Sequence, residues 1–75
     1  MSRIYLPDPI LVIIGNNIKK YRKTRYTQEK LAFALGWHRT SVYRMENGLI
    51  DISAKNLVKL SKFLEIPVAK FFKGV

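Results

Sequence analysis

The stretch from Arg39 to Asn47 concentrates side chains that recognise bases in duplex DNA. Arginine donates two hydrogen bonds to guanine, asparagine pairs with adenine, and a threonine methyl group contacts the thymine methyl group. On a helical wheel of about 100° per residue, the small and apolar residues Ser41, Val42 and Met45 fall on one side. The opposite side carries Arg39, Thr40, Tyr43, Arg44 and Asn47, with Glu46 at its edge. A helix here therefore has one side suited to a protein core and one suited to nucleic acid.

The side chains needed for catalysis or metal binding are scarce. A catalytic centre needs converging titratable groups, and a metal site needs three or four ligands. The chain has no cysteine, which removes disulfides, thiolate ligands and thiol nucleophiles. Its few other candidates are His38, Asp8, Glu29, Glu46, Asp51 and Glu65. We therefore expect no enzymatic activity, no metal, no cofactor and no small-molecule ligand.

The charge of the chain indicates a polyanionic partner. Fourteen Lys and Arg residues against five Asp and Glu residues give a net charge of +9 on only 75 residues. Such an excess is typical of proteins that bind nucleic acid or an anionic membrane surface. Lys19, Lys20, Arg22, Lys23 and Arg25 lie close together, and like charges three and four residues apart destabilise a helix unless a partner neutralises them.

A membrane role is not favoured by the apolar pattern. The longest apolar run, Ile10–Ile14, is far shorter than the ~20 residues that span a bilayer. Residues 1–8 contain a proline and an acid but no apolar segment of the kind found in secretory signals. We expect a cytoplasmic protein that is associated with the nucleoid when bound to DNA.

Local signals place the Arg39–Asn47 stretch in a series of short helices. Asp8-Pro9 predicts a helix start, with the acid as N-cap and the proline at the first helical position. Apolar residues then recur at helical spacing until the pattern fades near residues 23–25. Gly15 lies inside this helix, where glycine costs about 1 kcal/mol relative to alanine.

Two further helices frame a turn. Thr27 predicts the cap of a second helix, Gln28–Leu35, and Gly36 predicts its end. The third helix is expected to run from Arg39 to residue 46 or 47, closed by Asn47-Gly48. The short separation places the second and third helices next to each other.

A fourth helix begins after Ser53, and its buried stripe consists of Leu57, Leu60 and Leu64. Pro67 separates it from a short final turn at residues 68–72. No segment alternates apolar and polar residues for long enough to predict a strand. The sequence therefore predicts an all-α fold, a compact five-helix bundle in a single domain over residues 1–75, with residues 1–7 as an N-terminal tail.

The order of these motifs resembles the Cro/lambda-repressor-type helix-turn-helix proteins, the XRE family. The resemblance rests on Thr27-Gln28-Glu29-Lys30-Leu31-Ala32 with Leu35-Gly36, on Thr40-Ser41-Val42, and on Glu46-Asn47-Gly48. It extends through Asn56-Leu57-Val58-Lys59-Leu60 and Leu64-Glu65-Ile66-Pro67. It implies a five-helix bundle that binds operator DNA, usually as a dimer, to regulate transcription. His38-Arg39-Thr40 is also similar to the restriction–modification controller proteins, which are small dimeric members of the family.

The resemblance implies roles for individual residues. Gln28 matches a glutamine that contacts a phosphate and braces the recognition helix, and Asn47-Gly48 matches a loop that approaches the phosphates. His38 matches the N-cap of the recognition helix, which is expected over residues 39–47. We expect DNA contacts from Thr27, Gln28, His38, Arg39, Thr40, Tyr43, Arg44, Asn47, Lys19 and Lys20.

The same resemblance assigns structural roles elsewhere. Arg22 and Glu46 match an ion pair that holds the first helix against the third. The turn at residues 23–26 is one residue shorter than is usual in the family, so the first helix must end earlier or the turn must tighten. Core burial accounts for Phe71 or Phe72 but not for both, and we expect the remaining apolar surface near the C-terminus to form a self-complementary dimer patch.

These features predict a sequence-specific transcriptional regulator that occupies an operator in double-stranded DNA as a homodimer. The site is expected to be an inverted repeat, with affinity from phosphate contacts and sequence choice from the third helix. Two alternatives remain open: an antitoxin-like or other protein-interaction module on the same fold, and a basic membrane-surface protein. The second is disfavoured because the basic residues are spread over four helices.

Overall fold

The computed structural model describes residues 6–75, and within that range the chain forms four α-helices and one short 3-10 helix. These are α1 (Pro9–Arg22), α2 (Gln28–Leu35), α3 (Arg39–Glu46), α4 (Ala54–Leu64) and η1 (Val68–Phe72). The all-helical prediction is confirmed, but the count of five α-helices is wrong. The last element, Val68–Phe72, is a 3-10 helix of five residues, and a segment that short does not form a stable α-helix. Residues 1–5 of the expected tail lie outside the described residues.

The helix boundaries follow from local capping. The side chains of Asp8, Thr27 and Ser53 accept hydrogen bonds of 2.9–3.1 Å from backbone amides in the first turns of α1, α2 and α4. These bonds satisfy amides that have no partner within the helix itself. Gly36 ends α2 in the left-handed conformation, with φ at 72°. The predicted starts of these three helices and the end of α2 are therefore confirmed.

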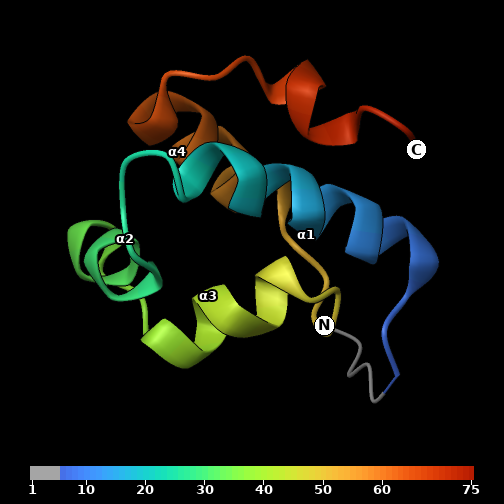
Figure 1. Cartoon of the computed structure of the whole chain (residues 1–75), viewed down its shortest axis with the longest axis horizontal. Coiled ribbons are helices and arrows are strands. Elements are labelled where there is room, and N and C mark those ends of the chain that lie inside the picture. Colours follow the sequence, from blue (N-terminus) through green and yellow to red (C-terminus); the bar gives the residue numbers. More distant parts are fainter. Residues whose placement is uncertain (1–5) are drawn as a thin grey trace.

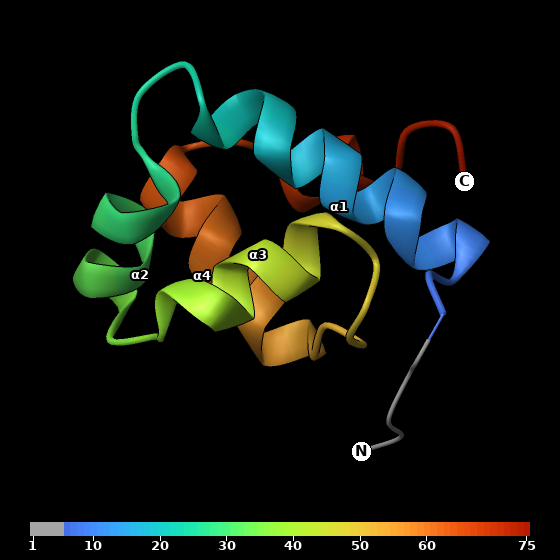
Figure 2. The ribbon, with the colours of Figure 1, turned by 60° about the horizontal axis from the view of Figure 1, so that its bottom comes forward.

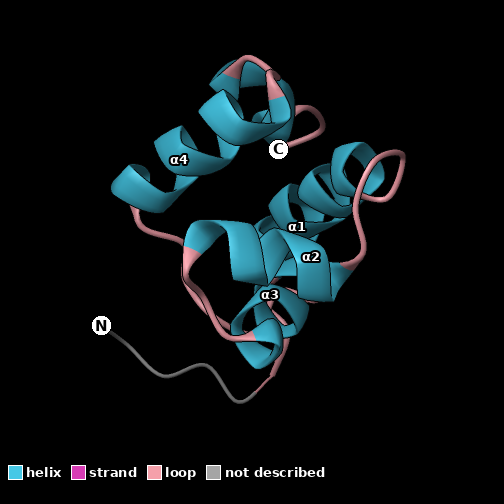
Figure 3. Cartoon of the chain, turned by 90° about the vertical axis from the view of Figure 1, so that its left-hand side faces the viewer, coloured by secondary structure: helices cyan, strands magenta, loops and turns pink. Residues whose placement is uncertain are grey.

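The helices pack around α1 (Figure 1). In that view α3 lies on one side of α1, α4 and η1 lie on the other, and α2 lies at the end where α3 begins. Figure 2 shows α2 and α3 side by side, and Figure 3 shows α4 on the far side of the molecule from α3. The Cα atoms extend over 27 × 25 × 20 Å. No helix between Leu6 and Val75 is both long and apolar enough to cross a membrane.

Every helix contributes to one apolar core. The leucines predicted for the stripe of α4 are buried, and Phe71 of η1 is fully buried while Phe72 is 40% exposed, as expected for that pair. Trp37 and Tyr21 pack at the margin of the core. The fully or nearly fully buried apolar residues are Ile14, Ile18, Leu31, Ala32, Val42, Met45, Leu57, Leu60, Leu64 and Phe71.

Gly15 allows α1 to lie directly against the end of α3. A Cβ atom at this position would lie 2.7 Å from the backbone oxygen of Glu46 and closer still to that of Met45. No side chain fits into that space. The helical cost of the glycine is therefore offset by the close approach of two helices.

The short turn after α1 is tight. α1 ends at Arg22, whose carbonyl oxygen accepts hydrogen bonds from the amides of Arg25 and Tyr26 at 3.0 and 2.9 Å. Arg25 also donates from Nη1 to the carbonyl oxygen of Leu64 at 3.2 Å. The turn therefore closes by wrapping around the last carbonyl of α1 and is tied to the end of α4.

Candidate nucleic-acid interface

α3 has one buried side and one exposed side. Val42, Met45 and Glu46 are buried. The exposed residues are those that the helical wheel places outward, namely Arg39, Thr40, Tyr43, Arg44 and Asn47. Glu46, expected at the edge of that outward side, is only 1% exposed because it faces α1 and α2.

Glu46 is the centre of a buried hydrogen-bond network behind α3. Arg22 donates to both carboxylate oxygens, from Nε to Oε2 at 2.9 Å and from Nη2 to Oε1 at 2.8 Å. Gln28 donates from Nε2 to Glu46 Oε1 at 3.0 Å. Arg22 uses its Nη1 as well, to the carbonyl oxygen of Tyr26 at 3.1 Å. The predicted ion pair is confirmed, and the network joins α1, α2 and α3 through charge-assisted bonds of fixed geometry.

Two open hollows lie where the exposed sides of α2 and α3 meet. One, of about 200 Å³, is lined by Gln28, Arg39, Thr40 and Tyr43. The other, of about 410 Å³, is lined by Arg22, Thr27, Gln28, Glu29 and Arg39. Half of the residues predicted to contact DNA therefore surround one continuous region, in which Gln28 and Arg39 belong to both hollows.

The remaining α3 residues flank this region. His38 occupies the N-cap position of α3, but its side chain makes no capping bond. Arg44 is exposed in the last turn. The Asn47 side chain donates to the carbonyl oxygen of Tyr43 at 2.8 Å, and the amides of Asn47 and Gly48 donate within the chain. The loop after α3 is thus held in place by bonds to the helix it follows.

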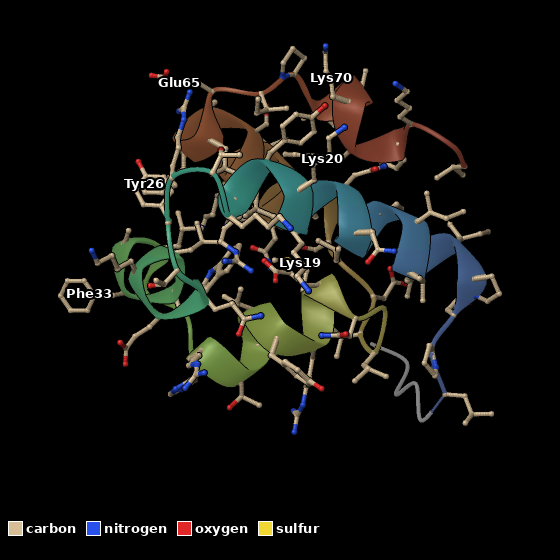
Figure 4. The ribbon with its side chains drawn as sticks, viewed as in Figure 1. Lys19, Lys20, Tyr26, Phe33, Glu65 and Lys70 are labelled. Atoms are coloured by element: carbon tan, nitrogen blue, oxygen red, sulfur yellow. The ribbon has the colours of Figure 1, made fainter. Side chains whose placement is uncertain are left out.

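Two neighbouring lysines of α1 point to different sides (Figure 4). Lys19 extends toward α3, whereas Lys20 extends toward η1, on the same side as Lys70. The Nζ of Lys20 lies 5.7 Å from the centre of the Tyr21 ring, and that ring packs against Phe71 of η1 at 6.4 Å. The structure therefore places Lys19 beside the α2–α3 region and Lys20 away from it.

Two residues that line this surface were not assigned to it from the sequence. Arg22 and Glu29 line the larger hollow. The position of Glu29 next to Thr27 and Gln28 at the start of α2 could have indicated it, whereas Arg22 comes from the end of α1. Phe33 is 88% exposed and points away from the body of the molecule (Figure 4). Its position outside the core follows from helical spacing, since Leu31 and Ala32 occupy the buried side of α2.

Comparison with known proteins gives consistent matches over most of the chain. The family model HTH_3, described as helix-turn-helix, matches residues 18–71. The control protein C.BamHI of Bacillus amyloliquefaciens is 36% identical over 63 residues, which are 81% of this chain and 78% of that protein. The control protein C.MunI of Mycoplasma sp is 35% identical over 70 residues, 91% of this chain and 95% of that protein.

A solved structure matches the fold with similar identity. The crystal structure of the restriction-modification controller protein C.AhdI from Aeromonas hydrophila superimposes with a TM-score of 0.76 and 33% sequence identity. The match covers 83% of this chain and 96% of that one.

Proposed function

We propose that this chain recognises its operator through the exposed side of α3. The chain belongs to the HTH_3 helix-turn-helix family and is a sequence-specific DNA-binding transcriptional regulator. In this proposal Arg39, Thr40, Tyr43 and Arg44 face the base edges in the major groove. Thr27, Gln28, His38, Asn47 and Lys19 contact or approach the phosphates, whereas Lys20, which extends toward η1, is left out of this set.

One observation carries this proposal. The side of α3 that is exposed bears hydrogen-bond donors and cations, while its buried side is fixed by Arg22, Gln28 and Glu46. Base recognition requires donors held at defined positions, and phosphate contacts alone carry no sequence information. A polar surface held rigidly from behind suits base recognition better than a loosely solvated one.

We also propose that the regulator acts as a homodimer on an inverted repeat. Half-sites on one face of B-DNA are about 34 Å apart, while the Cα atoms of the described residues extend over at most 27 Å, so in this proposal each copy contacts one half-site. Phe72 and Val75 are 40% and 62% exposed, and Val75 N donates to the carbonyl oxygen of Phe72 at 3.0 Å, which keeps the two together. This C-terminal apolar surface is proposed as the dimer contact.

The names of the relatives suggest which genes are controlled. Two are control proteins and one is a restriction-modification controller protein. We propose that this chain acts in the cytoplasm on the genes of a restriction–modification system. The bound site should then lie upstream of a DNA methyltransferase or endonuclease gene in the source genome.

Selection of bound duplexes from a random pool tests these proposals together. We expect a single enriched sequence with dyad symmetry, and a mass of two chains per duplex in sedimentation. A pool that stays random after several rounds at physiological salt would contradict base recognition. An enriched site without dyad symmetry would retain base recognition and remove the homodimer.

A further inference from the structure

We propose that the hollow lined by Gln28, Arg39, Thr40 and Tyr43 accepts the 5-methyl group of a pyrimidine in the major groove. In unmodified DNA this group belongs to thymine alone. The inference rests on the proposed use of the exposed side of α3. It names the chemical group of the operator that this side of α3 recognises. It also makes Tyr43 a specificity-determining residue.

The lining of the hollow is suited to a methyl group. Thr40, Tyr43 and Arg39, which line the hollow with Gln28, each carry apolar atoms: a methyl group, an aromatic ring and an aliphatic chain. Tyr43 is 52% exposed, so its ring presents apolar surface to water when no DNA is bound. The thymine methyl is the one apolar group on the base edges of the major groove. Covering both surfaces at once removes apolar area from water.

The hollow is also held in shape before DNA arrives. Thr40 and Tyr43 lie three residues apart on α3, so their side chains are neighbours on one face. The wall formed by Gln28 is fixed because its Nε2 donates to Glu46, which is held in turn by Arg22. A preformed site spends little of its binding energy on ordering side chains.

The hollow is accessible to a group that projects from a surface. Its volume is about 200 Å³, and it is open to solvent and continuous with the larger hollow lined by Thr27 and Glu29. A methyl group projecting from a base plane enters such an opening without the base leaving the stack.

Removing single methyl groups from the selected duplex tests the proposal. Each thymine is replaced in turn by deoxyuridine, which deletes the methyl group and keeps the base pair. We expect wild-type affinity to fall about fourfold at one position per half-site, the factor that corresponds to ~0.8 kcal/mol for a buried methyl-sized group. In a second arm that position carries cytosine or 5-methylcytosine opposite guanine, and the methylated duplex should bind about fourfold more tightly.

Variants of the chain assign the effect to the hollow. Tyr43→Ala should bind the thymine and deoxyuridine duplexes equally, whereas Tyr43→Phe keeps the ring and should keep the discrimination. Phe33→Ala removes another exposed aromatic ring, on the outside of α2, and should leave the discrimination unchanged. Thermal melts of the three variants verify that each is folded.

The outcomes separate this inference from the function on which it rests. If wild type binds an enriched site but tolerates deoxyuridine at every position, or if that site holds no constant thymine, the methyl proposal is wrong and base recognition stands. If Tyr43→Phe loses the discrimination as fully as Tyr43→Ala, the phenol hydroxyl rather than the ring is responsible, and the proposal is also overturned. If no sequence is enriched, the proposed function itself fails.

Discussion

The α2–α3 side and the α4–η1 end of this molecule share one apolar core, but among the described residues only the α2–α3 side also holds a buried ion pair. Behind α3, a buried glutamate accepts directional bonds from Arg22 and Gln28 at 2.8–3.0 Å. At the other end, Leu60, Leu64 and Phe71 are buried by apolar packing, and exposed apolar residues continue that surface outward.

The difference suits the role proposed for each region. Apolar packing is non-directional, which is sufficient for the contact between two copies proposed at the C-terminal end. Hydrogen bonds between charged groups fix angles as well as distances, so they hold α3 in one orientation. Recognition of base edges depends on that orientation, because hydrogen bonds weaken steeply with poor alignment.

Salt should distinguish the two regions most strongly. Binding to the duplex should weaken by about a thousandfold or more between ~50 and ~200 mM salt if a dimer contacts about six or more phosphates, because each contact releases counterions. Self-association through Phe72 and Val75 should change little over the same range. Fluorescence anisotropy and sedimentation measure the two equilibria. If duplex affinity does not change with salt, the two regions do not differ in this way and the prediction is wrong.

Removing the buried carboxylate should have the next largest effect. Glu46→Ala leaves the Arg22 guanidinium buried without its partner and should lower the free energy of unfolding by roughly 3–5 kcal/mol. Glu65→Ala is the matched control, because that side chain is 78% exposed and lies 3.8 Å from Arg25. A surface pair of this kind is worth about 0–1 kcal/mol. Equal denaturation midpoints for the two variants would show that the network adds nothing.

The contact between α1 and α3 can also be altered by a substitution that leaves the Arg22–Glu46 ion pair in place. Gly15→Ala places a methyl group 2.7 Å from the Glu46 carbonyl oxygen and should cost about 1–3 kcal/mol of stability by overpacking. Asn16→Ala, at an exposed position next to it, should stay within about 0.5 kcal/mol of wild type. Urea titration compares them, and a stable Gly15→Ala protein would mean that α1 and α3 separate easily.

The last prediction compares two residues of the proposed interface, and the effect of Lys19→Ala should be the smallest of all. Arg44→Ala should cost about 1–3 kcal/mol on the selected site and relax choice at one base pair per half-site, if Arg44 pairs with guanine. Lys19→Ala should weaken all duplexes about equally and reduce the salt slope by about one unit per protomer. Competition against single-base variants separates them. Identical, uniform losses would place Arg44 among the phosphate contacts.

Local features of the fold could be predicted from the sequence. Asp8, Thr27 and Ser53 bond to amides two or three residues away, so their types and positions are enough to locate helix starts. The outward side of α3 also follows from helical spacing alone. The Arg22–Glu46 pair was predictable only through the family resemblance, because 24 residues separate the partners.

Features that depend on distant packing could not be predicted. Asn17 donates to the carbonyl oxygens of Phe71 and Lys73, more than 50 residues away, and nothing in its neighbourhood indicates this. Lys19 and Lys20 point in different directions because successive residues of a helix are about 100° apart, but which of them faces α3 and which faces η1 depends on where those elements pack. The need for glycine at position 15 could not be predicted either, because it arises from the close approach of the α3 backbone to α1.

The separation of the two sides of α3 has a consequence for how such a regulator diverges. Arg39, Thr40, Tyr43 and Arg44 are exposed, and substitutions at exposed positions usually alter stability by no more than about 0.5 kcal/mol. The inner residues Gly15, Arg22, Gln28 and Glu46 keep the helix in place whatever its outer side carries. If the outer residues read the operator as proposed, a lineage could acquire a new operator preference one substitution at a time, with each intermediate folded.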